Sequence, residues 1–197
     1  GVVAGDTLYI GTAEGELVAL DRSSGLESWN FPLLGVDDQR AIYGMPTVDG
    51  ETVYFGGYDG ILYAVSLSGV EEGRERVGGL RDREKGWPIV GSPLLVDDVV
   101  LVGSSNGNLY AFDLGKPDRP WFSDKWRFET GGEVWSTPVV VDGIAFFGSL
   151  DHNVYAVALE VGSKVWQFET NGAVAAAPVV AQGRVFVGSF DGAFYAI

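Results

Sequence analysis

The sequence contains no cysteine, and it has one histidine and one methionine among 197 residues. Without cysteine, a disulfide framework, a thiolate zinc site and a cysteine nucleophile are all excluded. The single histidine, His152, leaves few options for a histidine-based metal cluster, and a lone histidine in a turn is more typical of a surface residue than of a ligand. No run approaches 18 consecutive apolar residues, so the sequence predicts no membrane-spanning helix.

Basic residues are also scarce. Lys and Arg number 13 against 27 Asp and Glu, which gives a net charge of −14. Nucleic acid and anionic membranes need basic side chains to neutralise phosphate, so neither is expected as a partner. The apolar share of 46% and the aromatic share of 13% are too high for a disordered chain. No basic-then-apolar leader precedes Gly1, so we expect either a removed leader or a longer parent chain.

Glycine is abundant, with 29 residues, about twice its ordinary share. Much of it belongs to an internal repeat. The strings GTAEGELVAL, GGYDGILYAV, GSSNGNLYAF, GSLDHNVYAV and GSFDGAFYAI begin 45, 47, 45 and 40 residues apart. A second marker, a proline followed by apolar residues, keeps the same register at Pro46, Pro93, Pro138 and Pro178. The repeats therefore span about 1–45, 46–92, 93–137, 138–177 and 178–197, the last one incomplete.

Each repeat contains four short stretches typical of β-strands. In the fourth repeat they cover 138–141, 144–148, 154–159 and 165–169, and Asp142-Gly143 between the first two is a favoured hairpin turn. Several strands are apolar on consecutive residues, which indicates sheets covered on both faces. Four-stranded units repeating every 40–47 residues predict an all-β fold, a β-propeller of four-stranded antiparallel blades. The chain forms a single domain of about five blades.

The repeat resembles the blade of the pyrroloquinoline-quinone-like (PQQ-like) propeller family. The family pattern, roughly PVV-DG-VYVGS-xDG-xLYALD-xxTG-xxxW, is matched most fully from Ala19 to Trp29 and from Ala156 to Trp166. The resemblance implies that Trp29, Trp126 and Trp166 dock between neighbouring blades. The second repeat lacks this tryptophan, and its last strand is expected near 74–77. Two insertions depart from the pattern, one charged at 81–86 and one rich in proline at 116–120.

The number of repeats is compatible with two kinds of propeller. Four repeats are complete, and the fifth stops after its third strand. Members of the family usually have seven or eight blades, which favours a fragment of a larger ring whose remaining blades would cover the open faces. A small five-bladed ring with one short blade is the alternative.

Candidate partner-binding residues lie on the connections between blades. By analogy with other propellers, these connections share a face with the turns between the second and third strands. Aromatic and arginine side chains on such loops are typical anchors for a partner. The sequence therefore singles out Arg40, Tyr43, Trp87, Glu133 and Trp135. In the alternative interpretation Trp87 and Trp135 pack between blades or plug the channel.

The turn between the second and third strands carries a recurring polar residue, which is Glu14, Asp59, Asn106, Asp151 or Asp191. A ring of carboxylates could bind a cation, but Asx-Gly is also what such a hairpin requires, and we favour that structural explanation. The same explanation serves Asp6, Asp49, Asp97 and Asp142 in the other hairpin. No catalytic residue, cofactor or metal ligand is assigned.

The resemblance to the PQQ-like family implies a non-enzymatic scaffold that binds a protein or peptide outside the cytoplasm, in the periplasm or extracellular space. Within the family the chain is similar to BamB-type outer-membrane assembly lipoproteins, to stand-alone PQQ-like repeat proteins and to sensor domains of membrane kinases. The alternative is a fragment of a PQQ-dependent quinoprotein dehydrogenase. Many such enzymes place a vicinal cysteine pair against the quinone and hold Ca²⁺ with a Glu/Asn/Asp set, and neither feature is present here.

Overall fold

The computed structural model describes residues 1–32, 41–78, 86–115 and 121–197, and every regular element in these ranges is a β-strand. The strands form five antiparallel sheets, which we call blades 1 to 5 in chain order. The all-β fold of four-stranded antiparallel blades predicted from the repeat is thus confirmed. The bounds are β1 Val2–Ala4, β2 Thr7–Gly11, β3 Glu16–Asp21 and β4 Glu27–Pro32 in blade 1; β5 Thr47–Asp49, β6 Thr52–Gly56, β7 Ile61–Ser66 and β8 Glu71–Arg76 in blade 2; β9 Leu94–Val96, β10 Val99–Ser104, β11 Asn108–Asp113 and β12 Ser123–Glu129 in blade 3; β13 Val139–Val141, β14 Ile144–Gly148, β15 Asn153–Ala158 and β16 Lys164–Glu169 in blade 4; β17 Val179–Ala181, β18 Arg184–Gly188 and β19 Phe194–Ala196 in blade 5.

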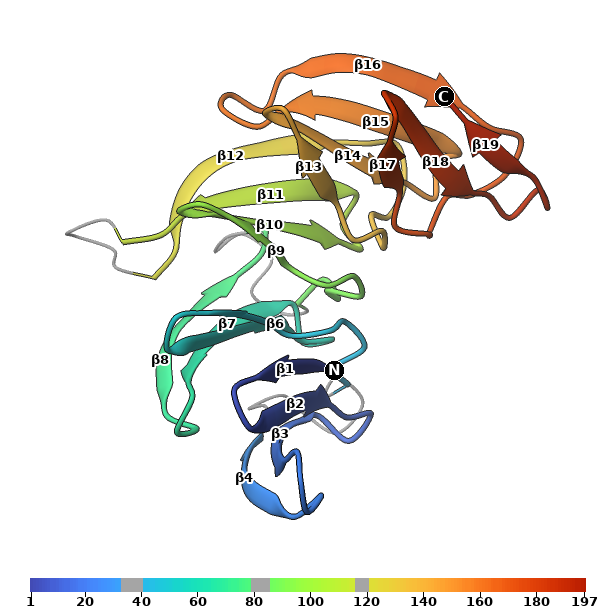
Figure 1. Ribbon diagram of the computed structural model, residues 1–197. Coiled ribbons are helices and arrows are strands. Elements are labelled where there is room, and N and C mark those ends of the chain that lie inside the picture. Colours follow the sequence, from blue (N-terminus) through green and yellow to red (C-terminus); the bar gives the residue numbers. More distant parts are fainter. Residues whose placement is uncertain (33–40, 79–85, 116–120) are drawn as a thin grey trace.

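The blades are arranged side by side in an arc (Figure 1). The first strand of each blade lies on the inside of the arc, where β1 contacts β5, β5 contacts β9 and β13 contacts β17. The fourth strand of blades 1 to 4 lies on the outside. Blade 1 and blade 5 lie at the two ends of the arc. Neighbouring strands of a blade are consecutive in the chain, so every blade is a simple antiparallel meander.

The hairpin predicted at Asp142-Gly143 is present. Both residues have positive φ, 51° and 73°, as a type I′ turn between two right-twisted strands requires. The predicted strands of blade 4 match β13 to β16 to within one residue. One boundary was wrong, because β8 runs over Glu71–Arg76 and not from position 74 to 77. Its sequence EEGRER has no apolar alternation from which its start could be read.

The hydrophobic core lies between blades rather than within a single sheet. Side chains on both faces of β6, β7, β10, β11, β14 and β15 are buried, which explains why these strands are apolar on consecutive residues. Stacking one sheet on the next buries these faces, and burial of apolar surface is the dominant favourable term in folding. Within the described ranges, no helix is present that could cross a membrane.

Candidate protein-binding rim

One edge of the arc is a rim built from two kinds of loop. These are the connections between blades and the turns that join the second and third strands. The two are tied together by backbone hydrogen bonds that recur at each junction. The N–H groups of Tyr58, Ser105, Leu150 and Phe190 donate to the carbonyls of Ala41, Pro88, Glu133 and Ala173, at 2.8–2.9 Å. In the described residues, these hydrogen bonds fasten each connection to the neighbouring turn of the rim.

Each connection also inserts one β-branched side chain into the core. These side chains belong to Ile42, Ile89, Val134 and Val174, and they are 0–4% exposed. Each one packs on a glycine at the end of the second strand of the preceding blade, and a Cβ atom there would collide with it; these glycines are Gly11, Gly56, Gly103 and Gly148. Part of the glycine excess thus serves close packing of the rim onto the blades rather than turns.

Two of the predicted partner-binding side chains are accessible on the rim. Tyr43 is 62% exposed and stands edge-on to Tyr58, with ring centroids 5.5 Å apart. Trp87 is 41% exposed. Met45, which the sequence analysis did not single out, is 56% exposed two residues after Tyr43. A lone methionine gives no periodic signal that could have found it.

The other predicted residues are placed differently. Trp135 is half-buried, and its Nε1 donates to the Oγ of Ser105 at 3.0 Å. Glu133 is half-buried, and its backbone carbonyl is one of the rim acceptors. Arg40 lies outside the described residues.

The recurring turn acids do more than shape a hairpin. In blade 4, Oδ1 of Asp151 accepts from the N–H of Asn153, while Oδ2 accepts from the hydroxyl of Tyr155 at 2.6 Å and from the N–H of Gly131 at 2.7 Å. Gly131 belongs to the connection that leaves blade 3, so the carboxylate ties two blades together. Asp191 makes the same three kinds of contact in blade 5, with Ala193, Tyr195 and Asn171.

The hydrogen bonds set the ionisation of these acids. Burial opposes the charge of Asp151, but the three donors together outweigh burial and hold its pKa below the usual value. Asp59 in blade 2 is 4% exposed, and there burial wins, so its pKa is raised despite hydrogen bonds from Tyr63 and Ile61. In the described ranges no three acidic or histidine side chains gather as they would around a metal ion.

The tryptophans of the fourth strands contact the next blade in two cases. Nε1 of Trp29 donates to the carbonyl of Leu67 at 2.9 Å, and Nε1 of Trp126 donates to that of Leu159 at 2.7 Å. Each indole also covers a glycine of the same turn, Gly69 or Gly162. Trp166 packs on Phe146 of its own blade, with ring centroids 5.7 Å apart and the rings tilted by 43°, and its Nε1 has no acceptor among the described residues.

The junction between blades 2 and 3 departs from this scheme. Gly73 occupies the tryptophan position in β8, since it pairs with Ala64 as Trp29 pairs with Ala19. The space over Gly73 is filled from the opposite direction, by Trp121 of blade 3. The next residue, Phe122, is buried in the same interblade core. Its ring centroid lies 6.2 Å from that of Tyr54 and 6.0 Å from that of Phe112.

Comparison with known proteins decides the family. The family model described as "Outer membrane protein assembly factor BamB" matches residues 1–121 and 123–197. This chain belongs to the BamB-like family of PQQ-like repeat proteins. A curated BamB from Xanthomonas campestris pv. campestris is 30% identical over 115 residues, which cover 58% of this chain and 26% of that protein.

Solved structures confirm the propeller fold. BamB from Moraxella catarrhalis superposes with a TM-score of 0.62 at 21% identity, covering 98% of this chain and 70% of that one. Quinohemoprotein alcohol dehydrogenase from Comamonas testosteroni superposes with a TM-score of 0.79 at 14% identity, covering 100% of this chain and 40% of that one. The chain thus spans about a quarter of the length of its curated BamB-like relative and less than half of the dehydrogenase.

Proposed function

We propose that this BamB-like chain is part of a non-enzymatic propeller scaffold of the cell envelope, and that its rim binds a protein partner. The observation that carries the proposal is the exposure of three large side chains, Tyr43, Met45 and Trp87, on a rim whose backbone is fixed by hydrogen bonds. Large side chains held on a rigid surface lose little entropy on binding and are typical interface anchors. The family supports the partner class and the location, because it is the family of the outer membrane protein assembly factor BamB.

Site-specific crosslinking tests the rim. A photo-reactive amino acid replaces Tyr43 or Trp87, and, as matched controls, Leu26 or Val161, which are 70% and 65% exposed on turns outside the rim. We expect crosslinks to one defined envelope protein from the rim positions, with little product from the controls. The double variant Tyr43→Ala, Trp87→Ala should weaken capture of that protein by about tenfold or more. Equal crosslinking from rim and control positions would contradict the proposal.

We also propose that further blades stack on the two ends of the arc. They would cover the face of blade 1 that points away from blade 2 and the face of blade 5 that points away from blade 4. Phe194 in blade 5 is 74% exposed, whereas Leu62, Leu109 and Val154 at the same position of blades 2 to 4 are 0% exposed. At the other end, Gly25 has the left-handed backbone of the tryptophan-covered turns, with φ of 71°, but no described atom lies within 4 Å of where its Cβ would be.

Oligomeric state tests this second proposal. The 197-residue chain should self-associate and bind a hydrophobic dye, because a large exposed apolar face is an aggregation hazard. A polypeptide carrying additional blades should be monomeric and bind little dye. If the 197-residue chain stays monomeric and does not increase the fluorescence of the dye, the proposal of further blades is contradicted.

A fragment of a quinoprotein dehydrogenase is the second candidate, favoured by a fold likeness that covers 100% of this chain. Mixing the full-length protein with pyrroloquinoline quinone and Ca²⁺ distinguishes the two. A scaffold should leave the quinone spectrum unchanged and reduce no dye, whereas tight binding with turnover would support the dehydrogenase.

A further inference from the structure

A groove of about 470 Å³ lies between blade 4 and blade 5, and its walls include Phe146, Trp166, Gly183, Val185 and Ile197. Blade 5 has three strands, and among the described strands β19 pairs only with β18. We propose that this groove binds a β-strand together with the tight turn that leads into it, and that the strand is supplied by the same polypeptide, beyond Ile197. The source of the strand rests on the proposal that further blades stack on the arc.

The junction between blades 1 and 2 shows what occupies the corresponding space beside a complete blade. There the turn between β7 and β8 lies against Trp29 of β4. Leu67 in this turn donates its N–H to the carbonyl of Glu51 at 2.9 Å and accepts a hydrogen bond from Nε1 of Trp29 at 2.9 Å. Gly69, two residues later, has a φ of 85° and lies so close to the indole that a Cβ atom would collide with it. The turn therefore binds the indole through its backbone.

The junction between blades 3 and 4 repeats these contacts. Leu159 donates its N–H to the carbonyl of Gly143 at 2.9 Å and accepts from Nε1 of Trp126 at 2.7 Å. Gly162, three residues later, has a φ of 68° and covers the indole in the same way. In both junctions one leucine thus bridges the first hairpin of its own blade and the tryptophan of the preceding blade.

Trp166 is held in the same pose without a turn to bind. The ring centroids of Trp29 and Tyr9 are 5.7 Å apart, with the planes tilted by 47°. Those of Trp166 and Phe146, which occupy the same positions in blade 4, are also 5.7 Å apart, with a tilt of 43°. Since Nε1 of Trp166 has no acceptor among the described residues, an oriented donor is available in the groove. A donor that is already oriented loses little freedom when it binds a carbonyl.

The first hairpin of blade 5 supplies the second partner. Gln182-Gly183 has φ values of 51° and 73°, the same as those of Asp142-Gly143 in blade 4. The carbonyl of Gly143 accepts from Leu159, whereas in the described part of the chain the carbonyl of Gly183 accepts no hydrogen bond. The groove therefore presents one donor and one acceptor that a single residue satisfies in the complete junctions.

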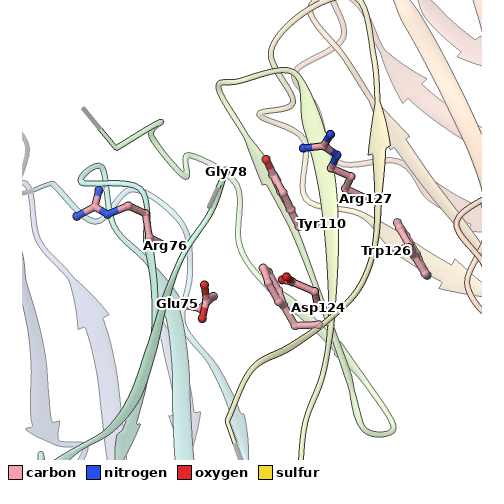
Figure 2. A pocket seen from close by; sticks show the side chains of 8 residues that line it. Glu75, Arg76, Gly78, Tyr110, Asp124, Trp126 and Arg127 are labelled. Carbon is pink, nitrogen blue, oxygen red and sulfur yellow. The ribbon is translucent and has the colours of Figure 1, made fainter. Parts of the chain in front are cut away.

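The open edge of β19 supplies the rest of the recognition surface. In blades 1 to 4 the third strand pairs with a fourth one, and an unpaired edge accepts an added strand through backbone hydrogen bonds. The cavity of about 370 Å³ between blades 2 and 3 has no such edge, because both of those blades have four strands (Figure 2). A small polar ligand would reach the two polar groups of the groove but leave the strand edge open, so an extended peptide is the better fit.

Peptide binding tests the groove on the 197-residue chain. The probe is a fluorescently labelled peptide with the sequence of positions 158–169, ALEVGSKVWQFE, which is the turn and fourth strand of blade 4. The matched control carries valine in place of Gly162, where a side chain would collide with the indole. At protein concentrations below those that cause self-association, fluorescence anisotropy should show saturable binding of the probe and at least tenfold weaker binding of the control. Equal binding of the two peptides, or no binding, would overturn the proposal.

Variants of the chain locate the bound peptide. Trp166→Phe removes the indole donor and should weaken binding of the probe by about fivefold, as expected for one neutral hydrogen bond. The matched control is Trp126→Phe, at the same position of the junction that is already filled, and it should leave the affinity unchanged. An equal loss of affinity in both variants would show that the peptide binds elsewhere.

A longer polypeptide identifies the source of the strand. A protein that carries the further blades should bind neither peptide, because its own segment fills the groove. If it binds the probe as tightly as the 197-residue chain does, the strand comes from another molecule and the proposed source is wrong. Self-association of the 197-residue chain without selective peptide binding would overturn the groove alone and leave the further blades standing. Selective binding by a chain that stays monomeric would support the groove and contradict the further blades.

Discussion

Trp121 lies directly over Gly73, across the junction between blades 2 and 3, so close that a Cβ atom at Gly73 would collide with the indole. In the junctions on either side, a tryptophan of the fourth strand reaches forward to a glycine turn of the next blade. Here the tryptophan reaches backward, from blade 3 to blade 2. Gly73 stands in β8 where β4 has a tryptophan, and the indole that covers it comes from blade 3.

The two residues should be energetically coupled. Trp121→Ala removes the indole from the interblade core and should cost about 3 kcal/mol of unfolding free energy. Gly73→Ala alone should also destabilise, because the new methyl group collides with Trp121. In the Trp121→Ala background the same Gly73→Ala change should be neutral or stabilising. Urea denaturation of the four proteins gives the coupling energy, and strictly additive losses would refute the contact.

Trp126 and Trp166 occupy matching positions in the fourth strands of blades 3 and 4. We expect the indole N–H of Trp126 to contribute more to stability than that of Trp166. Trp126→Phe keeps most of the ring but leaves the carbonyl of Leu159 without its donor, so it should cost about 1–2 kcal/mol. Trp166→Phe should cost less, because its Nε1 has no acceptor among the described residues. Thermal unfolding of both variants checks this ordering. A larger loss for Trp166→Phe would show that its indole has a partner in the folded protein.

Asp151 should stabilise the chain in a pH-dependent way. Its pKa is held below the usual value of 3.8, so its contribution is present above that value and is lost as the pH falls through the folded-state pKa. Asp151→Asn keeps the shape of the side chain but presents N–H groups to the Gly131 donor. We expect the variant to be about 1 kcal/mol less stable at neutral pH and the difference to shrink in acid. A difference independent of pH would contradict an ionised Asp151.

Asp59 should behave in the opposite way. Burial raises its pKa above 3.8, so between that value and the folded-state pKa the unfolded chain loses its proton while the folded chain keeps it. Stability conferred by Asp59 is therefore greatest in acid and declines as the pH rises through this window. Asp59→Asn should remove that decline. Denaturation curves across the acidic range, compared with the Asp151→Asn series, measure both slopes.

His152 adopts a positive φ of 74° at a turn position where the other four blades have glycine, namely Gly15, Gly60, Gly107 and Gly192. A side chain in the left-handed region costs about 1 kcal/mol, which glycine avoids. His152→Gly should therefore stabilise the chain by up to about that amount. Calorimetry of the variant measures the gain, with Asn153→Gly, one residue later in β15, as a control that should destabilise. A destabilised His152→Gly would show that the imidazole makes a stabilising contact.

The sequence by itself determined the repeat, the strand order and the stacking of blades. Hairpin turns such as Asp142-Gly143 and the consecutive apolar residues of each blade are local signals, and local signals can be read without knowing which blades meet. The rim was expected on one edge by analogy with other propellers, once the repeat had predicted the propeller fold. The expectation that Trp29, Trp126 and Trp166 dock between blades came from the resemblance to the PQQ-like family and not from the periodicity.

Only the tertiary structure decided what each junction contains. Trp121 follows the proline-rich insertion, and nothing in its own repeat indicates that it packs on Gly73 of the previous blade. From the sequence, Asp151 is an ordinary turn residue. Only the structure shows that its carboxylate accepts a hydrogen bond from the N–H of Gly131 in the preceding connection. The cavity of about 370 Å³ that Glu75 and Asp124 line lies between blades 2 and 3, so it appears only when the two blades are stacked. Contacts across a junction join residues far apart in sequence, and a repeat encodes each blade but not the deviations of its neighbour.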